Sequence, residues 1–226
     1  MDSDSLKRAA AESAAALVED GMVVGLGTGT TAAFAVEAIG KRVRAGLRIL
    51  GIPTSVRTSQ HARLLGIPLG ILTEDRRVDL TIDGADEVEM GSLNLIKGRG
   101  GALLREKIVA SASERLVIVA DESKIVERLG RGPLPVEVVP FGWEATAGRL
   151  RDLGATPSLR RGPDGEPFLT DGGHYIADCI LSGGLSPASL EKTLDSIVGV
   201  VEHGLFLGMA SQVFVGGAHG LRMLSR

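Results

Sequence analysis

Acidic side chains gather in the segment DGADE at 83–87, which directly follows a predicted strand. Because ligands of open α/β sheets bind at the carboxyl ends of the strands, Asp83 and Asp86 are candidates for a functional site. The alternative is a local role, in which these carboxylates accept backbone N–H bonds within a turn. A further acid, Glu106, lies about one turn into a predicted helix, where its carboxylate could face the same cleft and act as a general base.

A lysine opens the glycine-rich segment KGRGGA at 97–102, just before that helix. The ammonium of Lys97 could reach an oxyanion as a point charge. The neighbouring charges of Arg105, Glu106 and Lys107 could instead form a solvated helix face, as most charge runs do. Together, a carboxylate that removes a proton and a cation that stabilises the resulting enediolate suit proton abstraction next to a carbonyl, with no need for a metal.

Another glycine-rich segment, GLGTGTT at 25–31, lies between a predicted strand and a predicted helix. The helix N-terminus presents free N–H groups there, and Thr28, Thr30 and Thr31 add hydroxyl donors, so the segment could bind an anion. It lacks the lysine of a P-loop, and Thr30 stands where a dinucleotide fingerprint needs glycine. We therefore expect a compact phosphate ester as the ligand; a tight turn without a ligand is the alternative.

The elements that must position these residues alternate along the chain up to about residue 130. Apolar periodicity predicts helices at 4–19, 31–39, near 59–65 and at 103–113, and strands at 22–26, 47–51, 78–83 and 116–120. Short apolar strands that alternate with helices predict βαβ units and a mostly parallel sheet.

The pattern changes near residue 130, where glycine and proline crowd a short stretch. Beyond it the sequence predicts short strands or segments at 136–139, 155–159, 167–170 and 175–181, and helices at 143–153 and 187–198. We interpret 131–204 as a small α+β domain. A last strand at 212–216 is expected to return to the first sheet, so that the large domain comprises 1–130 and 205–226.

Composition narrows the classes of function. The 226 residues carry a net charge of -3 without a basic block, so nucleic acid is not the expected partner. An acidic N-terminus and the absence of a long apolar run predict a cytoplasmic protein without a membrane span. Cys179 is the only cysteine and is expected in the core, and the four histidines show no ligand spacing, so no metal site is predicted.

Taken together, these motifs resemble the type A ribose-5-phosphate isomerase family. Further matching stretches are ADESK at 120–124, PLPVEV at 133–138 and GVVEHGLF at 199–206, so the match runs in order over nearly the whole chain. The resemblance implies an aldose–ketose isomerase of the pentose phosphate pathway that interconverts ribose 5-phosphate and ribulose 5-phosphate through an enediolate. It also implies no cofactor, a homodimer or a tetramer, and a Rossmann-like mostly parallel sheet flanked by helices, with the small α+β domain inserted near the C-terminus.

The resemblance also implies roles for matched residues. Glu106 would be the general base, and Asp83, Asp86 and Lys97 would handle ring opening and the hydroxyl and carbonyl oxygens. The substrate-binding residues that it implies are Thr28, Gly29, Thr30, Thr31, Gly84, Ala85, Gly98, Arg99, Gly100, Lys124 and Lys7.

Several positions keep alternatives open. Lys124 could be an ordinary surface lysine, and Lys7 could be a solvated lysine of an amphipathic helix. Arg99 stands where the family more often has glycine, so its side chain could touch substrate or point outward. His174 and His203 stand where asparagine is commoner.

Other functions also fit the anion-binding loops. One is a non-catalytic sugar-phosphate sensor, although about twenty residues before the first strand are too few for a helix-turn-helix output module. Another is a related sugar-phosphate deaminase or lactonase. The expected partner is in each case a small sugar phosphate.

Overall fold

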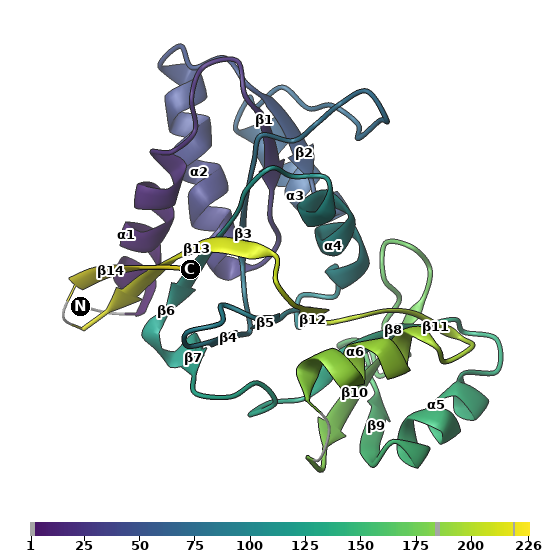
Figure 1. Cartoon of the computed structure of the whole chain (residues 1–226). Coiled ribbons are helices and arrows are strands. Elements are labelled where there is room, and N and C mark those ends of the chain that lie inside the picture. The colour runs from purple at the N-terminus through teal and green to yellow at the C-terminus, as the bar shows by residue number, and fades with distance from the viewer. Residues whose placement is uncertain (1–2, 184–185, 219) are drawn as a thin grey trace.

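A computed structural model describes residues 3–183, 186–218 and 220–226. A six-stranded sheet forms the centre of its fold (Figure 1). The strand order is β14-β13-β6-β3-β1-β2, and all neighbours are parallel except β14, which pairs antiparallel with β13. The strands are β1 (Val23–Leu26), β2 (Leu50–Pro53), β3 (Leu80–Gly84), β6 (Leu116–Asp121), β13 (Ala210–Gly217) and β14 (Gly220–Ser225). The mostly parallel α/β sheet and the return of the tail to it are confirmed.

Both faces of this sheet are covered, which is why β6 is apolar from Leu116 to Ala120. On β6, Val117 and Val119 belong to a core with the first two helices, whereas Leu116 and Ile118 belong to a core on the opposite face. The helices of this part are α1 (Ser3–Ala15), α2 (Thr30–Arg44), α3 (Val56–Leu64) and α4 (Leu103–Ser111).

A separate antiparallel sheet lies to one side, at the lower right of Figure 1. Its order is β11-β8-β10-β9, from β8 (Leu134–Val138), β9 (Ala155–Leu159), β10 (Tyr175–Leu181) and β11 (Val200–His203), with α5 (Trp143–Asp152) and α6 (Pro187–Asp195). Leu134, Val136, Leu150 and Cys179 form part of its buried core. The expected small α+β unit is therefore present, and Cys179 is a core residue as predicted.

Short strands that the sequence pattern did not predict join the two parts. They are β4 (Glu87–Glu89), β5 (Leu95–Ile96), β7 (Ile125–Val126) and β12 (Leu205–Phe206), in the order β12-β5-β4-β7, and a 3-10 turn, η1 (Glu122–Lys124), precedes β7. Runs of two or three residues are too short to show a period of two, so nothing in the sequence marks them as strands.

Other boundaries differ from prediction for identifiable reasons. The first helix ends at Ala15 rather than residue 19, because Leu17 and Val18 continue in tighter turns that still bury Val18 in the core. The second strand begins at Leu50 rather than residue 47, since the Arg48 backbone is bonded to Gly21 and to the Asp20 carboxylate. The segment at 167–170 is not a strand; only one isolated bridge forms, at Pro167.

No helix in the described part of the chain is both long and apolar enough to cross a membrane.

Candidate active site

The carboxyl ends of β1, β3 and β6 enclose one polar cavity of about 90 Å³. Its lining comes from the two glycine-rich loops, the end of β3 with the turn after it, the first turns of α2 and α4, and the end of η1. The lining residues are Thr28, Gly29, Thr30, Thr31, Gly84, Ala85, Asp86, Lys97, Gly98, Gly100, Glu106 and Lys124. Segments far apart in sequence therefore meet at the edge where parallel α/β sheets bind ligands.

The threonine-bearing loop is held against β3 by close backbone contact. The Thr28 N–H donates to Asp83 Oδ1 at 3.0 Å, and a Cβ at position 27 would overlap the Asp83 side chain, so only glycine allows this approach. Gly29 then takes a φ of 117° as the N-cap of α2. The loop consequently directs the free N–H groups of the first helical turn toward the cavity.

The Thr28 hydroxyl is engaged behind this loop in a buried hydroxyl cluster. It lies 2.7 Å from the Thr54 hydroxyl, 2.8 Å from Ser55 Oγ and 3.1 Å from the Thr58 hydroxyl. Ser55 also caps α3 by accepting the Thr58 N–H at 3.0 Å. Sequence reasoning missed this cluster, although a serine followed three residues later by threonine at a helix start was its signal. The cluster fixes the loop and occupies the Thr28 hydroxyl, while Thr30 and Thr31 also line the cavity.

Three buried charged groups form the centre of the site. Lys97 Nζ lies 3.1 Å from Asp83 Oδ2 and 3.1 Å from Glu106 Oε1, and it donates to the Gly84 carbonyl at 2.5 Å. The three side chains are at most 5% exposed. Two carboxylates around one ammonium leave an excess negative charge in a medium of low dielectric.

This arrangement shifts the pKa values of all three groups. Burial raises the pKa of Asp83. Burial and the negative charge of Asp83 together raise the pKa of Glu106 to about 8. The ammonium of Lys97 opposes both shifts. Burial would lower the pKa of Lys97, but the carboxylates of Asp83 and Glu106 outweigh it and raise that pKa. Asp83 also accepts the N–H groups of Thr28 and Gly84, so its ionised form is the better stabilised of the two. Glu106, which lines the cavity as Asp83 does not, is the carboxylate in position to take a proton from a ligand.

Three residues predicted for the site do not line the cavity. Asp83 lies behind it, where it holds Lys97. The Arg99 side chain is exposed and packs toward Gly132, although its backbone N–H donates to Asp86 Oδ2 at 2.9 Å. Lys7, on α1, pairs with Asp4 at 3.5 Å. The other predicted substrate-binding residues all lie in the lining.

Residues of the small unit reach the helix that carries Glu106. The Asp171 carboxylate accepts the Val56 N–H at 2.7 Å, and its Oδ2 lies 3.4 Å from Arg105 Nη1. The ring centroid of Phe206, which is fully buried, lies 5.5 Å from Lys97 Nζ. These contacts were absent from the sequence predictions because their partners are distant along the chain.

A larger hollow of about 590 Å³ lies on the small unit, between α5 and the turn that follows α6. Its lining is mainly apolar and includes Arg149 and Asp152. It contains no lysine beside paired carboxylates, so the smaller polar cavity is the better candidate for catalysis.

Comparison with known proteins identifies similar chains over the full length. Residues 50–220 match the family described as ribose 5-phosphate isomerase A (phosphoriboisomerase A). A protein of Gloeobacter violaceus named ribose-5-phosphate isomerase A is 62% identical over 226 residues, covering 100% of this chain and 98% of the relative. The protein of that name from Thermomicrobium roseum is 53% identical over 227 residues, covering 100% of this chain and 96% of the relative.

Solved structures agree with these sequence relatives. Ribose 5-phosphate isomerase A from Methanocaldococcus jannaschii superposes with a TM-score of 0.95 at 39% identity, covering 100% of both chains. A D-ribose-5-phosphate isomerase in complex with phospho-erythronic acid superposes with a TM-score of 0.95 at 37% identity, again covering 100% of both chains.

Proposed function

Because the chain belongs to the ribose 5-phosphate isomerase A family and so interconverts ribose 5-phosphate and ribulose 5-phosphate, we propose that Glu106 is the general base of this reaction. The main support for this proposal is the contact inside the polar cavity between Glu106 Oε1 and Lys97 Nζ, which lie 3.1 Å apart. A carboxylate with a raised pKa is basic enough to take a proton from carbon, and the adjacent ammonium can stabilise the oxyanion that results.

The proton transfer starts from the open-chain aldose. The Glu106 carboxylate removes the proton on C2, and the electron pair of that bond forms the C1–C2 double bond of the enediolate as the C1 carbonyl oxygen becomes negative. Glu106 then returns the proton to C1, while the proton of the O2 hydroxyl passes to O1, so that O2 becomes the ketone oxygen and O1 the hydroxyl of the product. The ammonium of Lys97 stabilises the charge on oxygen throughout, so atoms and charge balance without an added reactant.

The other predicted residues divide between two tasks. Asp86 lines the cavity, which supports a role in moving hydroxyl protons and in ring opening, whereas the buried Asp83 supports Lys97 and Thr28 from behind. We assign the phosphate to the N-terminus of α2 at Gly29, Thr30 and Thr31, with Lys124 as the cation. The contributions of Arg99 and Lys7 stay predictions.

Replacement of the base tests this assignment. Glu106→Gln should lower kcat by about 10²- to 10⁴-fold, because the amide cannot accept the proton, while phospho-erythronic acid should still bind. Turnover would be followed by a coupled assay of ribose 5-phosphate and binding by calorimetry. The exposed Glu12, on α1, provides the matched control, and Glu12→Gln should keep full activity. Turnover of Glu106→Gln close to that of the unsubstituted enzyme would reject Glu106 as the base.

We also propose a cytoplasmic homodimer that divides into domains at the predicted boundaries, with 131–204 as the small domain. All strands of the small antiparallel sheet fall between Leu134 and His203, which supports these boundaries. Sedimentation would measure the oligomeric state. No observation favours a sensor, a deaminase or a lactonase.

A further inference from the structure

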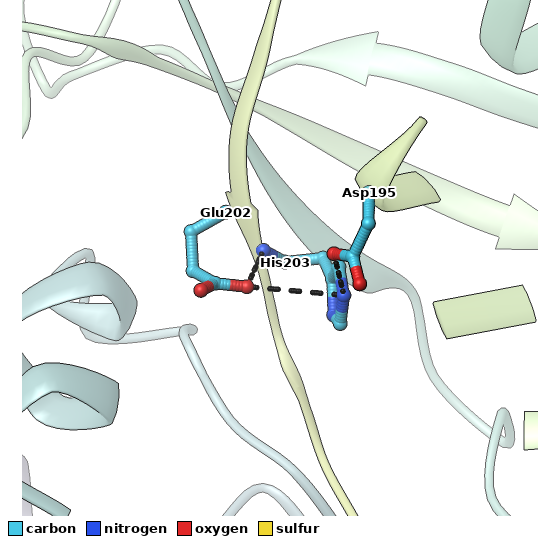
Figure 2. Close-up of side chains that lie close together, drawn as sticks. All are labelled: Asp195, Glu202 and His203. Carbon is cyan, nitrogen blue, oxygen red and sulfur yellow. Dashed lines mark hydrogen bonds and ion pairs between the residues drawn. The ribbon is translucent and has the colours of Figure 1, made fainter. Parts of the chain in front are cut away.

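A second cluster of titratable side chains lies beside helix α4, outside the cavity. Figure 2 shows Asp195, Glu202 and His203 with their polar atoms turned toward one another. His203 Nε2 lies 3.1 Å from Asp195 Oδ1 and 3.8 Å from Glu202 Oε1, and the imidazole is 1% exposed. One imidazole and two carboxylates are a donor set that could suit a metal ion.

The hydrogen bonds of His203 oppose a metal. Its Nδ1 accepts the Leu205 N–H at 3.2 Å, so the proton of the neutral ring is on Nε2, which donates to Asp195. A protonated nitrogen has no lone pair for a metal. The Glu202 carboxylate is also already paired with the Lys107 ammonium, at 2.5 Å. The cluster therefore binds the charged side chain of another residue of the chain, and not a metal ion.

That cation belongs to the helix that carries Glu106. Lys107 Nζ donates to Glu202 Oε1 at 2.5 Å and to the His203 carbonyl at 2.8 Å, and it lies 5.1 Å from the ring centroid of Phe206. Its side chain is 15% exposed. Neighbouring helical residues project about 100° apart, so Lys107 can reach this cluster while Glu106 faces the cavity.

The same backbone segment, 202–206, also contacts the lysine that partners Glu106. The Gly204 carbonyl accepts the Lys97 N–H at 2.9 Å, and the ring of Phe206 lies near Lys97 Nζ. A Cβ at position 204 would overlap the Lys97 carbonyl, so glycine is required for this contact. One segment thus touches Lys97 directly and the helix of Glu106 through Lys107.

Within the ranges that the structure describes, helix α4 has no side-chain cap at its N-terminus, so its other polar contacts come from the flanks of the helix. Its N-cap residue, Ala102, makes no side-chain capping bond among the described residues. The residues on either side of Glu106 make the ion pairs instead: Arg105 with Asp171, and the more buried Lys107 with Glu202.

We infer that Lys107 is a positioning residue, which holds Glu106 against Lys97 by joining α4 to the segment 202–206. The inference rests on the proposed role of Glu106 as the base. A displacement of the base by about 1 Å is enough to lower turnover on the order of 10²-fold, so a lateral contact can control the rate without touching substrate.

The first test replaces the ammonium by an apolar group of similar length. Lys107→Met should lower kcat by about 10- to 100-fold. The Kd of inorganic phosphate, and its binding stoichiometry of one phosphate per chain, should not change. The acid limb of the kcat/KM profile should move to lower pH, because a released Glu106 gains solvent and its pKa falls. Lys41→Met, on the exposed surface of α2, is the matched control and should behave as the unsubstituted enzyme. An unchanged kcat and pH profile in Lys107→Met would overturn the inference.

A double variant separates positioning from simple neutralisation of Glu202. Lys107→Met leaves the Glu202 carboxylate without its cation, which lowers Tm, and the addition of Glu202→Gln removes that charge. If Lys107 positions the base, the double variant regains Tm but keeps the low kcat. If kcat recovers with Tm, Lys107 only balances charge and the inference is wrong.

A third variant keeps the test decisive if either of these fails to fold. Glu202→Gln alone retains the side-chain shape and should lower kcat by about threefold or more, because it weakens the contact. Its Tm should fall less than that of Lys107→Met, since the Lys107 ammonium keeps the His203 carbonyl as an acceptor. An unchanged kcat there would also overturn the inference. Glu106→Gln, assayed in parallel, identifies failure of the base assignment separately, since only that failure leaves Glu106→Gln active.

Discussion

At the scale of single residues, the chemistry depends on how one buried ammonium is shared. Lys97 contacts Asp83 and Glu106 at equal distances of 3.1 Å, yet the two acids differ in their other partners. The Asp83 carboxylate accepts two backbone N–H groups, whereas the Glu106 carboxylate makes no further hydrogen bond within the described structure. Environment, and not residue type, therefore separates the supporting carboxylate from the basic one.

The raised pKa of Glu106 makes stability depend on pH. Its pKa is about 8 in the folded chain against an ordinary value of 4.5, so the folded state retains a proton that the unfolded state releases. The stabilisation by this proton is complete below pH 4.5 and is lost as the pH rises through 8. Glu106→Gln has no such proton to lose, so its Tm should exceed that of the unsubstituted chain by about 2 °C or more at pH 9 and by less at pH 5. A Tm difference that does not grow between these pH values would contradict the shift, and Glu12→Gln serves as the control.

At the scale of elements, the threonine-bearing loop works because its backbone touches β3. Gly27→Ala should push the loop away from Asp83, with a loss of about 1–3 kcal/mol in the free energy of unfolding and a raised KM for ribose 5-phosphate. Denaturant titration and steady-state kinetics would measure both. Gly148→Ala is the control, because Gly148 lies within α5 with open space around its Cβ position, and alanine there should keep or slightly raise stability. Equal behaviour of the two variants would show that the close approach at Gly27 is not needed.

At the scale of the whole molecule, the small unit contacts the catalytic part through Asp171. Its carboxylate accepts the Val56 N–H at the first turn of α3 and pairs with Arg105 of α4. Asp171→Ala should lower the free energy of unfolding by about 1 kcal/mol and Tm by about 2–4 °C. It should also speed hydrogen exchange of the Val56 amide, which loses its acceptor. Asp164→Ala removes only a local turn bond to the Glu166 N–H and should leave that exchange unchanged. Unchanged exchange at Val56 in Asp171→Ala would show that the contact is not maintained in solution.

The amino-acid sequence by itself determined which functional side chains are present and that they lie at the carboxyl-end edge of the parallel sheet. Glycines between strand and helix, acids directly after β3, and a lysine before α4 are local patterns, and parallel strands bring their carboxyl ends to one edge whatever their partners. Only the tertiary structure decided which groups pair. Lys107 and Glu202 are 95 residues apart, and the outward turn of Arg99 depends on its packing toward Gly132. Such contacts have no signal in a single sequence, because periodicity reports which face of an element is apolar and not which distant segment packs against it.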